Sequence, residues 1–203
     1  MRLGILGGTF DPIHIGHLAA ARAAMECAHL DRVMFIPSAQ PPHRAMAAAR
    51  AEDRLAMTRV AVEGEPRFEV SDIEVARGGT SYTADTLAEL HRVHPGDELF
   101  LILGWDAARL FKTWHEPQRV TALASVVIVG RPGTQTPDLF EIGAAGLDPA
   151  RVIKCFVDTP DVSASDLRKL LAVRESVAGK VPAGVQRYIT NKHLYGDNRT
   201  VGT

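Results

Sequence analysis

Residues 2–17 read RLGILGGTFDPIHIGH, and this stretch sets a pattern that the rest of the chain repeats. Its first part, Arg2–Leu6, is a short apolar run of the kind that forms a buried β-strand. The paired glycines Gly7 and Gly8 end that run, and helical spacing follows over His17–Ala28. The chain is therefore expected to open with a strand, a glycine-containing loop and a helix.

The same alternation of apolar strands and helices continues along the chain. Further strands are predicted at Arg32–Ile36, Phe68–Val75, Glu98–Leu103, Ser125–Val129 and Val152–Val157. Further helices are predicted at Ala51–Glu63, Thr83–Val93, Ser165–Arg174 and in a last segment that begins at Pro182. Continuous apolar strands separated by helices indicate a parallel sheet covered on both faces. We therefore expect one doubly wound, Rossmann-like α/β domain over residues 1–195, with a loop or weak helix at 131–151 and a flexible tail at 196–203.

Composition limits the classes of function. The chain has 203 residues, 46% of them hydrophobic, and its 23 basic and 24 acidic side chains leave a net charge of −1. A nucleic-acid-binding protein needs a basic surface, so this balance argues against that partner. The apolar runs are too short to span a bilayer, which argues against a membrane protein. Cys27 and Cys155 are too few for a disulfide framework, so we expect a protein with reduced thiols in the cytoplasm, and its assembly into a homo-oligomer is left open.

Ligands of doubly wound sheets bind at the carboxyl ends of the strands, near the point where the strand order reverses. The residues that follow the predicted strands are therefore the first place to look for a site. They are Gly7–His17, Pro37–Arg44, Gly104–Asp106 and Thr159–Arg168. By contrast, the charged residues Arg50, Glu52, Asp53 and Arg54 indicate a solvated helix start.

The first of these segments carries the features of an anion site. Its glycine pair lets the backbone approach a ligand closely, and His14 and His17, three residues apart at a helix start, fall on one face. A helix N-terminus adds N–H groups and the positive end of the helix dipole, which attract phosphate. The alternative is a tight turn before a helix with two solvent-facing histidines. The segment contains neither a P-loop nor a G-x-G-x-x-G fingerprint, which disfavours classical dinucleotide redox binding.

Residues 7–18, GGTFDPIHIGHL, resemble the H-x-G-H nucleotidyltransferase superfamily, and within it the nicotinate-nucleotide adenylyltransferase family. Four further segments fit that family in order and spacing, so the likeness covers nearly the whole chain. They are PPHR at 41–44, TSYTADTL at 80–87, GWD at 104–106 with Trp114 behind it, and VSASDLR at 162–168. Position 165 is Ser where the family often has Thr. The H-x-G-H string by itself indicates adenylyl or cytidylyl transfer, and the segment at 80–87 supplies the substrate preference.

The resemblance implies an adenylyltransferase that moves AMP from ATP to nicotinate mononucleotide, giving deamido-NAD and pyrophosphate in NAD biosynthesis. A mononucleotide phosphate is largely dianionic at pH 7, so it can attack the α-phosphorus in line, without a general base or a covalent intermediate. The protein then needs to position the reactants and to neutralise charge. Mg²⁺ is expected on the ATP phosphates, and no protein metal site is expected.

For ATP, the resemblance assigns the phosphates to three catalytic side chains, His14, His17 and Arg168. The guanidinium of Arg168 is a planar cationic fork that suits phosphate oxygens. Further ATP contacts are expected from Gly7, Gly8, Thr9, Phe10, Gly104, Asp106, Ser163 and Ser165. Without the resemblance, Val162–Arg168 would be an ordinary serine-capped helix with a surface arginine, and Asp106 would be a helix N-cap.

For nicotinate mononucleotide, the resemblance points to His43, Arg44, Ser81, Tyr82, Thr83 and Trp114. The cationic pair at 43–44 would clamp the acceptor's phosphate, although a solvated loop pair is the alternative. Backbone N–H groups at the helix start near Thr83 suit a carboxylate better than an amide, which favours nicotinate over nicotinamide. Trp114 would stack on the pyridine ring, or else is a half-buried structural residue.

Three other interpretations stay open at this point. Phosphopantetheine adenylyltransferase shares the fold and the donor chemistry, but it usually has Thr at the first His of H-x-G-H and lacks S-Y-T-x-D-T-L. A relative of class I aminoacyl-tRNA synthetases would carry K-M-S-K-S downstream, and this sequence has none. A non-catalytic nucleotide sensor would be expected to lose His14, His17 or Arg168, and all three are present.

Overall fold

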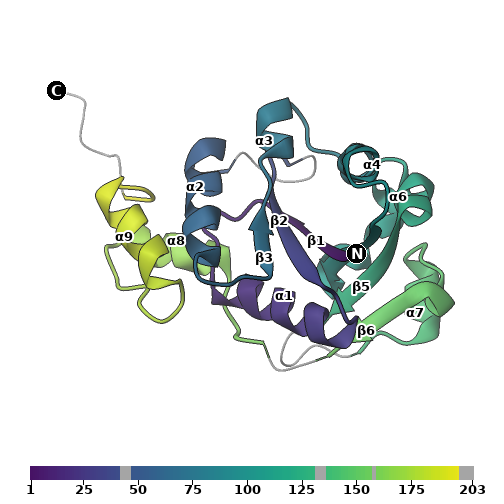
Figure 1. The fold of residues 1–203 in the computed structure, drawn as a ribbon. Helices are drawn as coiled ribbons and strands as arrows, with labels where there is room; N and C mark the ends of the chain where they lie inside the picture. The colour runs from purple at the N-terminus through teal and green to yellow at the C-terminus, as the bar shows by residue number, and fades with distance from the viewer. Residues whose placement is uncertain (42–46, 131–135, 157–158, 197–203) are drawn as a thin grey trace.

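The computed structural model describes residues 1–41, 47–130, 136–156 and 159–196, and Figure 1 shows their arrangement. Within these ranges six strands form one sheet: β1 (Arg2–Gly8), β2 (Arg32–Pro37), β3 (Phe68–Val70), β4 (Glu98–Gly104), β5 (Ala124–Val129) and β6 (Val152–Cys155). They lie in the order β3-β2-β1-β4-β5-β6, and every neighbouring pair is parallel. This confirms the predicted doubly wound sheet and puts the reversal of strand order between β1 and β4.

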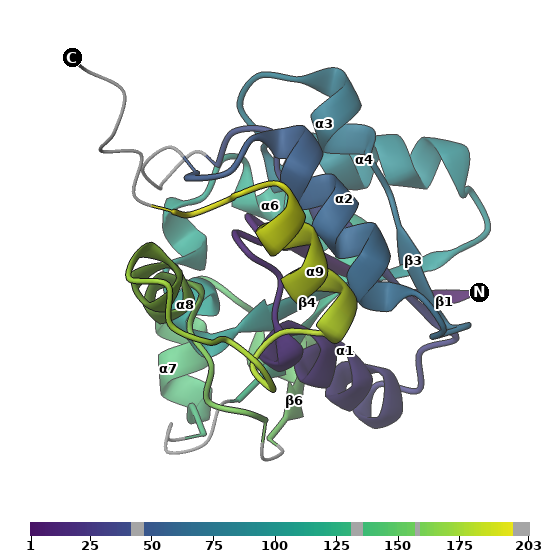
Figure 2. The same cartoon turned by 90° about the vertical axis from the view of Figure 1, so that its left-hand side faces the viewer.

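Helices cover both faces of the sheet. The longer ones are α1 (Ile15–Cys27), α2 (Ala51–Val62), α4 (Thr83–Val93), α6 (Pro117–Leu123), α8 (Ala164–Ala172) and α9 (Ala183–Asn191). The short ones are α3 (Ile73–Arg77), α5 (Trp105–Ala108), η1 (Phe111–Thr113), α7 (Leu139–Ala144) and η2 (Pro149–Arg151). The buried side chains of α1, α2, α8 and α9 pack in one layer, and those of α4, α5, α6 and α7 pack in the other. In Figure 2 the first layer faces the viewer, with α2 and α9 side by side.

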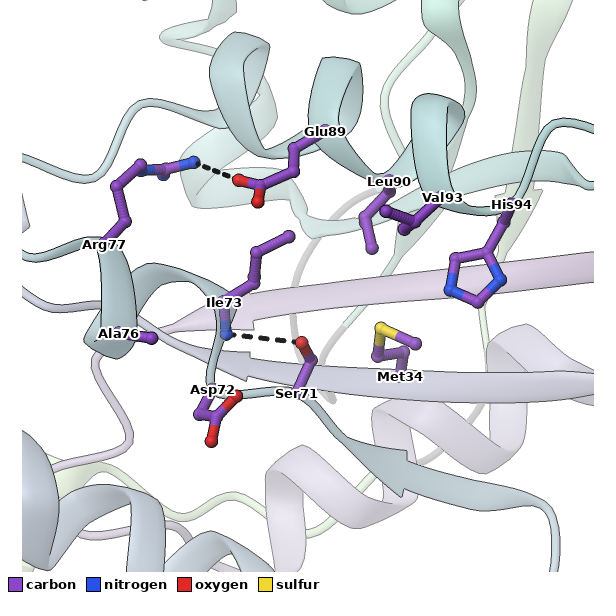
Figure 3. Close-up of a pocket in the computed structure, with 10 residues that line it drawn as sticks. All are labelled: Met34, Ser71, Asp72, Ile73, Ala76, Arg77, Glu89, Leu90, Val93 and His94. Carbon is purple, nitrogen blue, oxygen red and sulfur yellow. Dashed lines mark hydrogen bonds and ion pairs between the residues drawn. The ribbon is translucent and has the colours of Figure 1, made fainter.

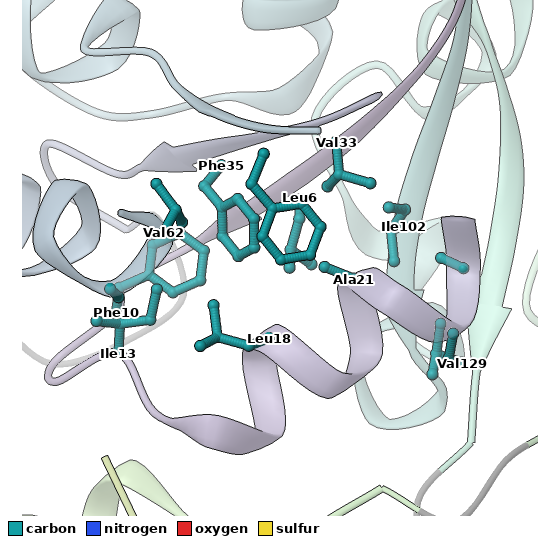
Figure 4. Packing of buried hydrophobic residues seen from close by; sticks show 14 of the residues in the cluster. Leu6, Phe10, Ile13, Leu18, Ala21, Val33, Phe35, Val62, Ile102 and Val129 are labelled. Carbon is teal, nitrogen blue, oxygen red and sulfur yellow. The ribbon is translucent and has the colours of Figure 1, made fainter. Parts of the chain in front are cut away.

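Side chains of the strands alternate between the two helical layers, as the pleat of a strand requires. On β4, Ile102 packs into the layer of α1, while its neighbour Leu101 packs into the layer of α4. Figure 4 shows the first layer, where Phe35 of the sheet lies toward Leu18 of α1 and Ile102 lies farther along that helix, on the side of Ala21. Both faces of the strands are buried, which is why the strands read as continuous apolar runs. No helix among the described residues is long and apolar enough to cross a membrane.

The structure corrects one predicted element and defines another. The predicted strand Phe68–Val75 ends at Val70. There the chain turns into α3, and the Ser71 hydroxyl accepts a hydrogen bond from the Ile73 amide at 3.3 Å, a local bond that competes with strand pairing. Within the segment 131–151, α7 begins with a capping box, in which Asp138 and Glu141 accept hydrogen bonds from each other's backbone amides.

The expectation of reduced thiols is wrong for this structure. Cys27, at the end of α1, and Cys155, at the end of β6, form a disulfide with their Cα atoms 5.9 Å apart. The two residues are 128 positions apart in the sequence. They meet because α1 packs across β5 and β6, an arrangement that cysteine spacing does not reveal. The bridge therefore fastens the first helix to the last strand of the sheet.

Cys27→Ser tests this bridge. Closing a loop of this length restricts the unfolded chain, so the substitution should lower the free energy of unfolding of the oxidised protein by up to about 5 kcal/mol. Urea unfolding with and without dithiothreitol measures the effect. Reductant should destabilise the wild type and leave the variant unchanged. Two titratable thiols in the unfolded, unreduced wild type would show that the bridge does not form.

Candidate active site

A cavity of about 650 Å³ opens at the carboxyl edge of the sheet, and the carboxyl ends of β1 and β4 form part of its lining. It brings together most of the residues that the sequence singles out. Those that line it are Gly7, Gly8, Thr9, Phe10, His14, His17, Ser81, Tyr82, Thr83, Gly104, Asp106, Trp114 and Arg168. Segments that follow different strands, and that lie far apart in the sequence, therefore form one continuous site. It lies at the place where a doubly wound sheet is expected to bind its ligand.

His14 and His17 lie together at the start of α1. Their rings stack with centroids 3.7 Å apart and planes 25° apart, and the His14 amide donates to His17 Nδ1 at 3.3 Å. The edge-on ring of Phe10, 5.0 Å from the His17 ring, packs against the pair. His14 is buried, at 4% exposure. The prediction that both imidazoles share one face is confirmed.

Gly16 stands between the two histidines, and its surroundings leave little room for a side chain. A Cβ at this position would lie 3.1 Å from His14 Nδ1 and 3.2 Å from the carbonyl oxygen of Pro160. Both distances are tighter than ordinary carbon contacts, and the carbonyl belongs to backbone. The glycine therefore lets the segment at 159–168 pack directly on the helix start that carries the histidines.

The prediction that Arg54 belongs to a solvated helix start is wrong. Its side chain is buried, at 1% exposure. Its guanidinium donates to three backbone carbonyls: Thr9 at 2.7 Å, Ala39 at 3.0 Å and Ala49 at 3.2 Å. Burial lowers the pKa of Arg54, and the nearby negative charge of Asp11 opposes that effect. The side chain thus joins the loop after β1 to both ends of the segment between β2 and α2.

Asp11 is the second buried charge beside the cavity, at 4% exposure. Its carboxylate accepts the amides of Ala48 at 2.7 Å and Ala49 at 3.1 Å. Its carbonyl oxygen accepts a 2.7 Å hydrogen bond from Arg168, whose guanidinium lies 4.0 Å from the carboxylate. Arg168 is therefore held against the loop that precedes the two histidines, which supports its predicted place in the same site.

Not every predicted residue joins the cavity. Ser163 and Ser165 are absent from its lining, and the Ser163 hydroxyl instead accepts from the Asp166 amide at 3.5 Å, as the N-cap of α8. Their predicted contact with ATP stays a prediction. His43 and Arg44 lie outside the described residues.

The other end of the cavity is formed by the start of α4 and by aromatic rings. Ser81 is fixed because its hydroxyl accepts the Ala39 amide at 2.9 Å. Tyr82 is the N-cap of α4, and its ring lies 4.3 Å from the ring of His115. Trp114 is half-buried beside Phe111. Helix N–H groups and flat rings together suit a planar anion.

Glu74 also lines the cavity, although the sequence interpretation did not single it out. Its carboxyl is buried and accepts the hydroxyl of Thr86 at 2.6 Å, and Thr86 in turn accepts from Arg77 at 2.9 Å. Burial raises the pKa of Glu74, against smaller opposing effects of Thr86, Ser81 and Arg77. The predicted strand Phe68–Val75 contains two other acidic residues, Glu69 and Asp72, so no signal in the sequence distinguished Glu74 from them.

A second hollow, of about 520 Å³, lies between α3 and α4 (Figure 3). The Arg77 and Glu89 side chains at its rim pair with each other at 3.3 Å, and Ser71 bonds the Ile73 amide. Its other charged or ionisable side chains are paired with neighbours outside the lining, Asp72 with Arg59 and His94 with Asp97, so the first cavity is the better candidate for an active site. No group of three or more His, Cys, Asp or Glu side chains able to hold a metal occurs among the described residues.

Comparison with known proteins agrees with this geometry. Residues 5–170 match the cytidylyltransferase-like family. A probable nicotinate-nucleotide adenylyltransferase of Thermus thermophilus is 44% identical over 195 residues, covering 96% of this chain and 100% of that protein. A protein of the same description from a Geobacter species is 41% identical over 216 residues, covering 98% of this chain and 100% of that protein.

Among solved structures, the fold is similar to Plasmodium falciparum nicotinic acid mononucleotide adenylyltransferase complexed with NaAD. The TM-score is 0.79 at 17% sequence identity, covering 96% of this chain and 97% of that one. The same Plasmodium protein complexed with APC gives a TM-score of 0.77 at 17% identity, covering 96% of each chain. At this identity the similarity concerns the fold alone.

Glu74→Gln tests the buried carboxyl through the pH dependence of stability. Because the pKa of Glu74 is raised above its ordinary 4.5, the folded protein holds this proton more tightly than the unfolded chain. As pH rises from 4.5 through the raised pKa, the unfolded chain loses its proton first, so the wild type's free energy of unfolding falls. Glutamine does not titrate, so the Tm of the variant should increase relative to the Tm of the wild type as the pH rises over this range.

The exposed carboxyl of Glu63 supplies the control. Thermal unfolding of Glu63→Gln should follow the wild type across the same pH range. Parallel Tm curves for Glu74→Gln and the wild type would mean that Glu74 titrates in the folded protein as it does in water.

Proposed function

The chain belongs to the nicotinate-nucleotide adenylyltransferase family, and from that membership we propose how the residues of its cavity share the reaction. The enzyme transfers AMP from ATP to nicotinate mononucleotide, giving deamido-NAD and pyrophosphate, a step of NAD biosynthesis. The observation that carries the division of roles is the stacked pair His14 and His17 at the N-terminus of α1, in the same cavity as the N-terminus of α4.

The end of the cavity near α1 takes the ATP phosphates. His14 and His17 donate to oxygens of the triphosphate, and their contribution grows as negative charge builds up around the α-phosphorus. Arg168 neutralises the departing pyrophosphate with its planar fork of N–H donors. Gly7, Gly8 and Thr9 frame this end by exposing backbone, which supports close approach of the nucleotide.

The end near α4 takes the acceptor. The first N–H groups of α4, after the N-cap Tyr82, receive the carboxylate of the nicotinate ring. Trp114 gives that ring a flat surface. Ser81 orients this segment through its bond to Ala39 rather than by direct contact. A nicotinamide ring would bring an NH₂ donor to a place where N–H donors already converge, so the acid is preferred over the amide.

The chemistry needs no nucleophilic side chain. An oxygen of the acceptor's 5′-phosphate forms a bond to the α-phosphorus of ATP, the bond from that phosphorus to the bridging oxygen breaks, and pyrophosphate leaves with the electron pair. The acceptor phosphate is already ionised at pH 7, so no proton has to be removed from it. The enzyme contributes position and charge neutralisation.

Mg²⁺ belongs to the substrate in this proposal, as MgATP, and it neutralises the polyphosphate when bound. The groups at the α1 end are imidazoles, backbone amides and a guanidinium, which suit phosphate oxygens better than a bare cation. The carboxylate of Asp11 is already engaged with two amides. A cytoplasmic location stays a prediction from the sequence.

Pyrophosphate release tests the function directly. Purified protein with MgATP is given nicotinate mononucleotide, nicotinamide mononucleotide or phosphopantetheine. We expect the highest kcat/KM with nicotinate mononucleotide, about tenfold or more above the amide, as for the loss of one hydrogen bond to a charged group. Equal rates with acid and amide would contradict the assigned role of the α4 N-terminus, and a preference for phosphopantetheine would contradict the function itself.

His17→Ala tests the role of the histidine pair. Loss of a donor that stabilises developing charge should lower kcat by on the order of 100-fold or more. The fold should stay intact, because His17 is only partly buried. His91→Ala, at an exposed position on α4 outside the cavity, is the control and should keep the wild-type rate. A near-normal kcat in His17→Ala, measured by pyrophosphate release, would remove His17 from the mechanism.

A further inference from the structure

Tyr195 lies near the end of the described chain and reaches back to its beginning. The phenol donates a 2.7 Å hydrogen bond to the carboxylate of Asp11, 184 positions away in the sequence. The described residues that follow α9 therefore end at the loop between β1 and α1. This contact lies behind the active-site cavity, since Asp11 lines the cavity and Tyr195 does not.

Asp11 forms hydrogen bonds with several segments around the site. One carboxylate oxygen accepts the phenol of Tyr195 together with the amide of Ala49, and the other accepts the amide of Ala48. The backbone carbonyl of the same residue holds the guanidinium of Arg168 at 2.7 Å. Any rotation of the Asp11 peptide would therefore move Arg168.

The backbone on both sides of this contact is held in an unusual conformation. Phe10, next to Asp11, has φ of +49°, and Tyr195 itself has φ of +65°. Bulky L-residues rarely adopt this left-handed region, because the Cβ crowds the following carbonyl. Such conformations persist where the surrounding contacts fix them, and they occur often at functional sites.

The phenol is suited to be a permanent donor. Burial, with the negative charge of Asp11 as a smaller cause, raises the pKa of Tyr195 above its ordinary range. The hydroxyl therefore keeps its proton at every pH at which the enzyme works. Asp11 in turn keeps a satisfied carboxylate, so its geometry does not depend on solvent.

We infer that Tyr195 is a positioning residue for adenylyl transfer: through Asp11 it fixes the loop before His14 and sets the guanidinium of Arg168 toward the phosphates of ATP. The inference rests on the role proposed above for Arg168. The guanidinium has five N–H donors, and its hydrogen bond to the Asp11 carbonyl uses one of them. Tyr195 does not line the cavity, so it acts on the reaction only through these two residues.

Tyr195→Phe removes the hydroxyl and keeps the ring. The chain offers a matched control in Tyr188→Phe, because Tyr188 of α9 likewise donates to a carboxylate, Asp53, at 3.0 Å, but Asp53, unlike Asp11, does not line the cavity. Both variants lose one phenol–carboxylate hydrogen bond. We expect Tyr195→Phe to lower kcat/KM for MgATP by on the order of tenfold, while Tyr188→Phe stays within about twofold of the wild type.

Thermal unfolding of both variants separates positioning from general stability. We expect similar, small decreases in Tm for the two, so that the difference in kcat/KM cannot arise from a loss of folded protein. Equal kcat/KM values for the two variants would overturn the proposal. A decrease in kcat/KM that accompanies a much larger decrease in Tm for Tyr195→Phe would also overturn it.

Arg168→Lys completes a double-mutant cycle and keeps the two proposals apart. If Tyr195 acts through Arg168, the double variant should be no slower than Arg168→Lys alone. If the two substitutions instead lower kcat/KM by factors that multiply in the double variant, Tyr195 does not act through Arg168. That result would overturn the inference and leave the role of Arg168 intact. A wild-type rate for Arg168→Lys would overturn the role of Arg168, and this inference with it.

Discussion

The buried guanidinium of Arg54 is the interaction on which the site depends. A charge removed from water must find partners, and Arg54 finds them in backbone carbonyls of Thr9, Ala39 and Ala49. These carbonyls belong to the loop after β1 and to the two ends of the segment between β2 and α2. Because the donors form a rigid planar fork, the distances between these segments are fixed together. Asp11 adds the balancing negative charge and fastens the same segments a second time.

This scaffold suits the proposed mechanism, in which no side chain acts as a nucleophile. The reaction supplies its own nucleophile and leaving group, so the protein contributes geometry and charge. Among the described residues of the cavity, helix N-termini, imidazoles and the guanidinium of Arg168 are the groups that suit anions, and they stand on elements held by the buried polar groups. At the acceptor end, the bond from Ala39 to Ser81 links the start of α4 to the same framework. The two substrate ends of the cavity are thus positioned relative to each other through Ala39 and Arg54.

The sequence was sufficient for the sheet and for the core of the site, because these follow from local patterns. Strands buried on both faces read as apolar runs, and the spacing of His14 and His17 puts both rings on one helix face. What could not be predicted depends on contacts between distant segments. Arg54 stands among exposed charged residues, and its burial follows only from the loops that fold over it. The contact of Tyr195 with Asp11 and the pairing of Cys27 with Cys155 have no local signature either.

The link between Cys27 and Cys155 turns residues 27–155 into a covalent ring. The two segments proposed to bind phosphate lie outside this ring, one on each arm that leaves it: His14 and His17 shortly before Cys27, and Arg168 shortly after Cys155. Through the sulfur atoms, the chemical path from the histidines to the arginine becomes a small fraction of the path along the backbone. The entropy lost when the two arms meet falls accordingly. The oxidised chain thus keeps the two halves of its proposed ATP site joined by a short covalent path even when the sheet between them is unfolded.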